Sequence, residues 1–228
     1  MKSVFKAAIL LAGAVALSAC TVQKGRNFSS EKAAAIVPGK TSKREVLAIM
    51  GEPLSAQTNT YRKDGAQKEL ANPAVIQRLE YYYSERNGSE NAIQEKILPN
   101  RLLDVFVMND TVVGVRRSSS FSADSTSFDH AKSSGLKKGQ TTQQEVLAML
   151  GAPSGKSVYP MSYVPGGETW FYAQTIINLA NGANEFKRLS ISFSEDKRVA
   201  DFTVGVDSEN RPVAPAPVVI PVVIPARK

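Results

Sequence analysis

The sequence has few of the residues on which most enzymatic and metal-binding sites depend. Its 228 residues include one cysteine, one histidine and one tryptophan. A single cysteine excludes a disulfide within the chain, and His130 has no second histidine with which to form a zinc site. A Ser-His-Asp triad and a glycine-rich phosphate loop are not recognisable either. We therefore expect no catalytic activity, no metal ion and no cofactor.

The sequence also lacks a dense basic patch with interleaved aromatic residues, so nucleic acid is not an expected partner. The formal net charge is +7. Lys2 and Lys6 belong to the N-terminal segment described next, and without them 26 of the 28 basic residues remain against 21 acidic residues. This mild positive excess suits an anionic envelope surface, either lipid headgroups or peptidoglycan. Ordinary solvated surface charge explains it as well.

No apolar run is long enough to span a membrane as a mature anchor. The run Ala7–Ala16 follows Lys2 and Lys6 and has the layout of a secretory signal. It leads into Leu17-Ser18-Ala19-Cys20, which resembles the lipobox of bacterial lipoproteins. The resemblance implies that Cys20 becomes the lipidated first residue, and Thr21 after it implies the periplasmic face of the outer membrane. The alternative is an ordinary signal peptide with a stray cysteine.

One stretch of the chain occurs twice. Residues 28–53 align without a gap on residues 128–153, with identity at 10 of 26 positions. In each copy Ser42 or Thr142 stands three residues before a glutamate, which is a capping box at the start of a helix. A stripe of apolar residues follows, and then a glycine suited to a left-handed C-terminal cap and a proline that ends the helix. The motif positions are Gly39, Gly51, Pro53, Gly139, Gly151 and Pro153.

After each capped helix the apolar pattern changes to a period of two, which predicts antiparallel strands. We therefore expect an α+β fold with two tandem helix–helix–antiparallel-sheet domains behind a lipoprotein signal peptide. The expected segments are a signal peptide (1–19), a tether (20–27), a first domain (28–117), a serine-rich linker (118–127), a second domain (128–208) and a Pro-rich extended tail (209–228).

With these motifs the chain resembles the BamE (SmpA/OmlA) family of outer-membrane lipoproteins. The second copy also carries Thr169-Trp170-Phe171-Tyr172, against which the first copy has Glu80-Tyr81-Tyr82-Tyr83. The chain departs from the family in two ways. The spacing from Gly39 or Gly139 to the next valine is one residue longer than in the family, and the family's namesake has one domain where this chain has two. The tandem arrangement also resembles that of the β-lactamase inhibitor protein, which carries disulfides that this chain cannot form.

The family resemblance implies a non-catalytic, lipid-anchored scaffold or accessory factor in outer-membrane assembly that binds an envelope protein. Two alternatives remain open, an inhibitor of a periplasmic hydrolase and a tether that binds peptidoglycan. When the turns that follow one strand of each copy are aligned, Leu103, Val105 and Val107 match Leu189, Ile191 and Phe193. We expect these residues on the sheet face beneath the helices.

The opposite sheet face of the second copy carries serines, whereas that of the first is apolar. Because a solvated sheet face is polar, something must cover this one. We expect either internal cover, from Ile93, Ile97 and Leu98 or from the second domain, or a protein partner. The candidate partner-binding residues are Tyr82, Leu102, Phe106 and Met108.

Overall fold

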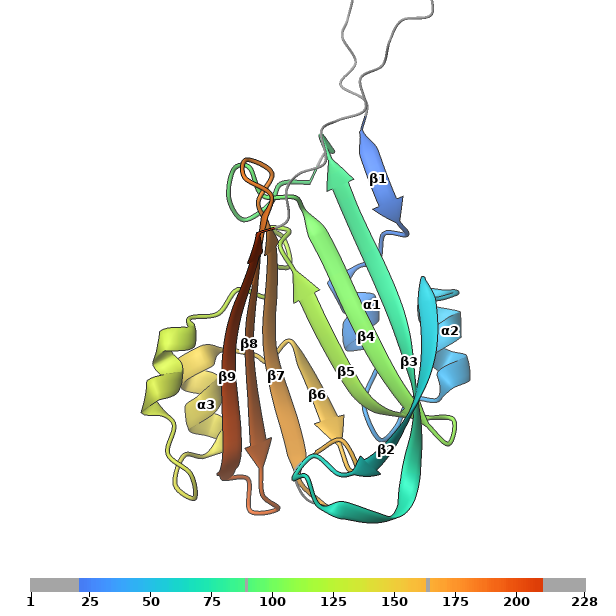
Figure 1. Ribbon diagram of the computed structural model, residues 1–228, viewed down its shortest axis with the longest axis vertical. Coiled ribbons are helices and arrows are strands. Elements are labelled where there is room, and N and C mark those ends of the chain that lie inside the picture. The colour runs from blue at the N-terminus through green and yellow to red at the C-terminus, as the bar shows by residue number, and fades with distance from the viewer. Residues whose placement is uncertain (1–20, 89, 163–164, 211–228) are drawn as a thin grey trace, which may run out of the picture.

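Nine antiparallel strands form one continuous sheet in the computed structural model, which describes residues 21–88, 90–162 and 165–210 (Figure 1). The order is β1-β3-β4-β5-β6-β7-β8-β9, and β2 pairs with the first part of β3. The strands are β1 (Val22–Gly25), β2 (Ser55–Lys63), β3 (Glu69–Arg86), β4 (Asn100–Met108), β5 (Thr111–Ser119), β6 (Gly155–Val158), β7 (Glu168–Ile177), β8 (Ala183–Phe193) and β9 (Val199–Asn210).

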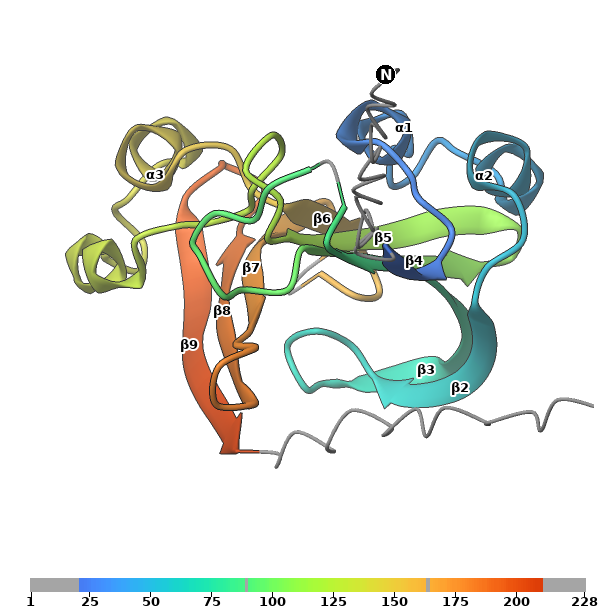
Figure 2. The ribbon, with the colours of Figure 1, turned by 90° about the horizontal axis from the view of Figure 1, so that it is seen from above.

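The described helices cover one face of this sheet, here called the outer face (Figure 2). They are α1 (Ser30–Ala34), α2 (Lys43–Met50), the 3₁₀ helix η1 (His130–Gly135) and α3 (Gln143–Leu150). Beneath α1 and α2 lies one apolar core, which includes Leu103, Val105 and Val107. A second core, with Leu189, Ile191 and Phe193, lies beneath η1 and α3. The alternation read from the sequence is therefore confirmed at these six positions.

The expected fold class is wrong. The structure is mostly antiparallel sheet in one nine-stranded layer, rather than a tandem of two helix–helix–sheet α+β units. The sheet is continuous because β6 pairs with β5, with Gly114 opposite Ser157 and Arg116 opposite Gly155. The strands are also longer than the helices, since β3 alone has 18 residues while no α-helix among the described residues exceeds eight. The alternating pattern revealed only residues 79–84, which lie in the second half of β3.

The two repeated helices end as the motif requires, but not in the left-handed conformation. Both capping boxes are present, with Glu45 and Glu145 bonded to their N-cap residues. Gly51 has φ 76° and ψ −163°, and Gly151 has φ 77° and ψ −166°. The positive φ is confirmed, whereas the ψ values lie in an extended region that is almost exclusive to glycine.

The sequence comparison aligned the strand after the repeated helix incorrectly, by two residues relative to the structure. The backbone N–H of Leu54 donates to the Glu80 carbonyl, as that of Ser154 does to the Phe171 carbonyl, both at 2.7 Å. Glu80 is therefore equivalent to Phe171, and Tyr81 rather than Tyr83 is equivalent to Tyr172. Consecutive tyrosines in the first copy concealed this register from the sequence.

The face opposite the helices, here called the inner face, is concave because the sheet bends at both ends. The hairpin formed by β2 and β3 curls beneath the centre of the sheet, and β8 and β9 descend on the other side (Figure 2). The backbone N–H of Gly65 at the hairpin tip donates to the Pro160 carbonyl at 3.0 Å. The first copy thereby contacts the second through the hairpin as well as through β5 and β6.

Candidate functional site: a groove on the inner face

The junction between the two copies is incomplete as a hydrogen-bonded sheet. The strand β6 begins at Gly155, and past that end of β6 no described strand lies between β5 and β7. Side-chain hydroxyls bridge this part of the junction instead. The Ser118 hydroxyl accepts from the Thr175 N–H at 2.8 Å, and the Thr126 hydroxyl donates to the Ala173 carbonyl at 2.6 Å. A groove lies on the inner face beside this part of the junction, where no described strand separates β5 from β7.

The groove has a volume of about 390 Å³, which lies within the usual range of ligand pockets. Strands of both copies supply its walls, so neither copy forms it alone. The first copy contributes Arg78, Tyr82, Asn100, Leu102, Asp104, Arg116, Arg117 and Ser118, and the second contributes Ala173, Gln174, Thr175, Ile177, Phe186, Lys187 and Arg188.

Five cationic residues and one acidic residue line the groove, although one of them, Arg117, also lines the groove on the outer face described below. The Asp104 side chain is completely buried and accepts from Arg78 Nε at 2.8 Å and from an Arg116 terminal nitrogen at 2.7 Å. Two guanidinium groups thus neutralise the single carboxylate. Arg188 contacts Asp207 at 3.5 Å with both side chains more than half exposed, so this pair contributes little stability.

Asn100 brings an unsatisfied acceptor to the groove. The residue is completely buried, and its Nδ2 donates to the Leu98 carbonyl at 3.0 Å and to the Ser120 hydroxyl at 2.9 Å. Its Oδ1 has no hydrogen-bond partner among the described residues. Because a carbonyl only accepts, the bond to Leu98 fixes which end of the amide is Nδ2. A buried acceptor without a partner is costly, and its presence in a groove suggests a donor from a ligand.

Two of the four predicted partner-binding residues lie in this groove and two do not. Tyr82 and Leu102 are half-buried in its wall. Phe106 is only 7% exposed and packs in a separate apolar cluster, with Met108 beside it. This cluster is closed by residues of the β2–β3 hairpin and of the second copy, chiefly Ala74, Ile76, Val158 and Met161.

Internal cover of Phe106 was one of the two expectations, and Val158 and Met161 of the second copy supply part of it, as one of the two named alternatives requires. Ile97 forms an isolated bridge with Asn178, and the Leu98 N–H donates to the Ile177 carbonyl. The insertion between β3 and β4, the other named alternative, therefore pairs with the β7–β8 turn and leaves Phe106 to the hairpin and the second copy. No pattern of residues indicated that β3 would bend so far.

The other predicted positions have structural roles. Trp170 and Tyr172 belong to the second core. Gly39 and Gly139 have positive φ, and their N–H groups donate to Val112 and Val199 carbonyls at 2.7 and 2.8 Å. Pro53 and Pro153 follow the helix ends. Cys20 lies outside the described residues. Asn100, Arg116 and Arg188 were not singled out, because alternation places them on the inner face without revealing which side chains lack partners.

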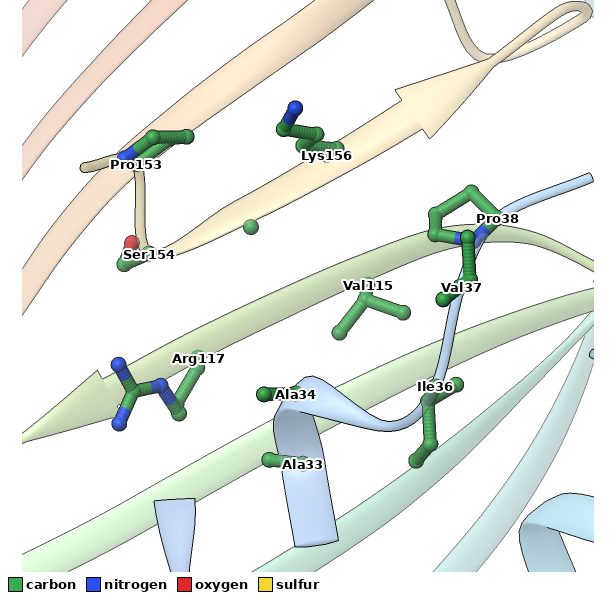
Figure 3. Close-up of a pocket in the computed structure, with 11 residues that line it drawn as sticks. Ala33, Ala34, Ile36, Val37, Pro38, Val115, Arg117, Pro153, Ser154 and Lys156 are labelled. Atoms are coloured by element: carbon green, nitrogen blue, oxygen red, sulfur yellow. The ribbon is translucent and has the colours of Figure 1, made fainter. Parts of the chain in front are cut away.

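A second groove lies at the same junction on the outer face (Figure 3). It has a volume of about 360 Å³ and runs between the end of α1 and the start of β6. Ile36, Val37 and Pro38 form one side, and Lys156 and Arg117 are its cationic residues. Arg117 contacts Asp124 at 3.7 Å, and Lys156 lies 4.7 Å from the centre of the Trp170 ring. Both cations are engaged, so the inner groove is the stronger candidate.

Neither a metal centre nor a membrane span emerges from the described residues. Within them, no three His, Cys, Asp or Glu side chains are grouped as metal ligands. None of the helices described combines the length and apolar character needed to cross a bilayer. Comparison of the chain with protein-family models, curated proteins and solved structures finds no match.

Proposed function

We propose that this chain is a non-catalytic, lipid-anchored protein of the periplasmic face of the outer membrane that binds an envelope protein in the groove on its inner face. The groove carries the proposal, since cationic and apolar residues of both copies meet there beside the unsatisfied Oδ1 of Asn100. The lipobox ending at Cys20 supports the anchor, and the resemblance to the BamE family supports a role in envelope assembly.

The position of the groove suits a partner near the membrane. β1 begins two residues after Cys20, and Gly25 pairs with Tyr83 at the end of β3. Asn100 at one end of the groove pairs with Ser84, the next residue along β3. The beginning of β1 and the end of β9 lie at this same end of the sheet (Figure 1). An acyl-anchored Cys20 would therefore hold the groove near the bilayer surface.

A binding role is favoured over catalysis by the state of the only carboxylate in the groove. Asp104 has both oxygens occupied by guanidinium groups, and its side chain is inaccessible to solvent. A carboxylate held in this way is poorly placed to accept a proton from a substrate. The groove does offer hydrogen-bond donors, cations and apolar walls, which are the elements of a recognition site.

Site-specific photocrosslinking in the envelope tests the proposal. A benzophenone amino acid at Tyr82 or Phe186 places the probe in the groove, and the same probe at Leu147, 43% exposed on α3, is the matched control. We expect a defined envelope-protein adduct from the groove positions alone. Adducts equally strong at Leu147, or none at all, contradict protein binding in the groove. Recovery of peptidoglycan fragments instead of protein favours the cell-wall tether.

The anchor is tested separately with Cys20→Ala. We expect this variant to leave the membrane fraction and to lose palmitate labelling, while the wild-type chain fractionates with the outer membrane. A Cys20→Ala chain that still fractionates with the outer membrane would refute lipid anchoring.

A further inference from the structure

We propose that the groove recognises an extended acidic segment of the partner, with a backbone N–H of that segment donating to Asn100 Oδ1. This inference rests on the proposed protein-binding function and specifies its chemistry. Three features of the groove support it independently: the buried acceptor, the cations and the opposed apolar walls.

The acceptor requires a donor that reaches a buried position. The Asn100 side chain is held by two bonds from Nδ2, while its backbone N–H donates to the Ser120 hydroxyl at 3.0 Å. Only Oδ1 remains without a partner among the described residues. A carboxylate or phosphate group has no N–H to offer this oxygen, whereas each non-proline residue of a peptide does.

The cations favour an acidic side chain on the same segment. Arg116 uses Nε and one terminal nitrogen for Asp104, which leaves its other terminal nitrogen without a described partner. Arg188 has only its exposed contact with Asp207 as a described ion pair, so it is free to exchange that partner for another carboxylate. Guanidinium groups bind carboxylates with strong, directional hydrogen bonds.

The apolar walls complete the description. Leu102 on β4 and Phe186 on β8 are half-buried residues of opposite sides of the groove. Tyr82 and Ile177 extend the two walls. An apolar side chain placed between them would lose contact with water. A peptide that carries an acidic and an apolar residue in an extended conformation therefore satisfies all three features.

Fluorescence anisotropy with synthetic peptides tests this inference on the full lipidated chain in detergent. The probes are labelled ten-residue peptides of mixed Glu and Leu, with Lys-and-Leu peptides of the same pattern as charge controls. We expect saturable binding of the acidic set alone, weakened by added salt. Methylation of the backbone nitrogens one at a time should identify one N–H whose loss weakens binding by about tenfold or more.

Protein variants locate the binding. Arg188→Gln should weaken binding of the acidic peptides by about tenfold, because it removes a charged donor from the groove. Arg44→Gln, an equal change in charge on the exposed face of α2, should leave binding unchanged. Circular dichroism of each variant verifies that it is folded.

The outcomes separate this inference from the proposed function. Equal binding of the basic peptides, equal loss in Arg44→Gln, or tolerance of every methylation overturns acidic-segment recognition. If the Tyr82 crosslink to an envelope protein persists in any of these cases, protein binding in the groove survives. Muropeptides that bind where the acidic peptides do not would overturn both.

Discussion

The Tyr172 hydroxyl donates a 2.9 Å hydrogen bond to the carbonyl of Gly151, the C-cap residue of α3. In the first copy the Tyr81 hydroxyl makes the same bond to the Gly51 carbonyl at 3.1 Å. Each bond ties the end of a short helix to the sheet beneath it. Because a two-turn helix is marginal alone, this attachment helps to define where the helix stops.

Tyr172→Phe and Tyr81→Phe should each destabilise the protein by about 1 kcal/mol, since each leaves a helix-terminal carbonyl without its donor. Urea unfolding followed by circular dichroism measures the change. Tyr61→Phe, at an exposed position of β2, should have almost no effect and serves as the control. Equal losses in all three variants would show that the bonds to Gly51 and Gly151 have no special role.

Alkaline pH should destabilise the fold through the buried tyrosines. Burial raises the pKa of Tyr81 to about 12, with a smaller contribution from Glu52, and burial followed by the Glu85 hydrogen bond raises the pKa of Tyr83 to about 12. Burial also raises the pKa of Tyr172. The folded state thus holds these protons more tightly than the unfolded state, whose tyrosines titrate near 10.

The stability that these protons provide is complete below pH 10 and is lost as the pH rises towards 12. Thermal unfolding measured between these values should show a falling midpoint. Tyr81→Phe and Tyr83→Phe, each measured against its own value at pH 8, should show a smaller relative fall. An unchanged pH dependence in both variants contradicts this assignment.

Replacement of Gly151 should be costly for alanine and for asparagine alike. A cap in the left-handed helical region accepts asparagine, but φ 77° with ψ −166° lies in a region that almost only glycine occupies. Nothing lies within 4 Å of a Cβ placed there, so any cost comes from the backbone rather than from a clash. We expect each substitution to lower the free energy of unfolding by about 1–3 kcal/mol.

Gly205→Ala in β9 is the matched control, because it has an equally open environment without a positive φ. Denaturant titration of the three variants decides the point. A markedly milder effect of Gly151→Asn than of Gly151→Ala would indicate that the residue adopts the ordinary left-handed cap in solution.

The repeated motif could be read from the sequence because its information is local. A capping box, an apolar stripe and a terminal glycine all act within ten residues, and both helices formed where the motif places them. Alternation likewise identified the buried faces of β4 and β8. These features depend on which side a residue faces, and period alone determines that.

The join between the copies could not be read in this way because it depends on contacts distant in the chain. The pairing of Gly114 with Ser157 rests on a four-residue strand that shows no alternating pattern long enough to detect. The groove follows from that join and from the bend of the sheet. Asn100 Oδ1 lacks a described partner because the side chain is held through Nδ2, which donates to the Leu98 carbonyl and the Ser120 hydroxyl. No residue pattern reveals these two bonds.

The apolar inner face of the first copy should behave as core. Phe106→Ala should lower the free energy of unfolding by about 3–5 kcal/mol, because it leaves a cavity among Ile76, Val113 and the residues of the second copy that meet there. Val75→Ala, at a position 55% exposed on β3, should change it by less than about 0.5 kcal/mol. A small effect of Phe106→Ala in denaturant unfolding would mean that the face is accessible in solution.

The tip of the β2–β3 hairpin provides a way to uncover this cluster without changing it. A Cβ added at Gly65 would clash with the backbone oxygen of Ser162, and the Gly65 N–H donates to the neighbouring Pro160 carbonyl. Because the obstacle is backbone rather than a flexible side chain, Gly65→Ala should push the tip away from the second copy. Hydrogen exchange of the backbone N–H groups near the tip, at residues 65–68, should then accelerate by about tenfold or more, because the free energy of local opening is lower.

The same variant should expose Phe106 to solvent while leaving the two cores beneath the helices protected. Exchange in α2 and α3 therefore serves as an internal reference within each sample, and Gly205→Ala serves as the reference protein. Unchanged protection at the hairpin tip would mean that the contact with Pro160 contributes nothing to closing the cluster. Loss of protection throughout the chain would instead make the hairpin contact a condition for the whole sheet to fold, since it joins the two copies at a place separate from the pairing of β5 with β6.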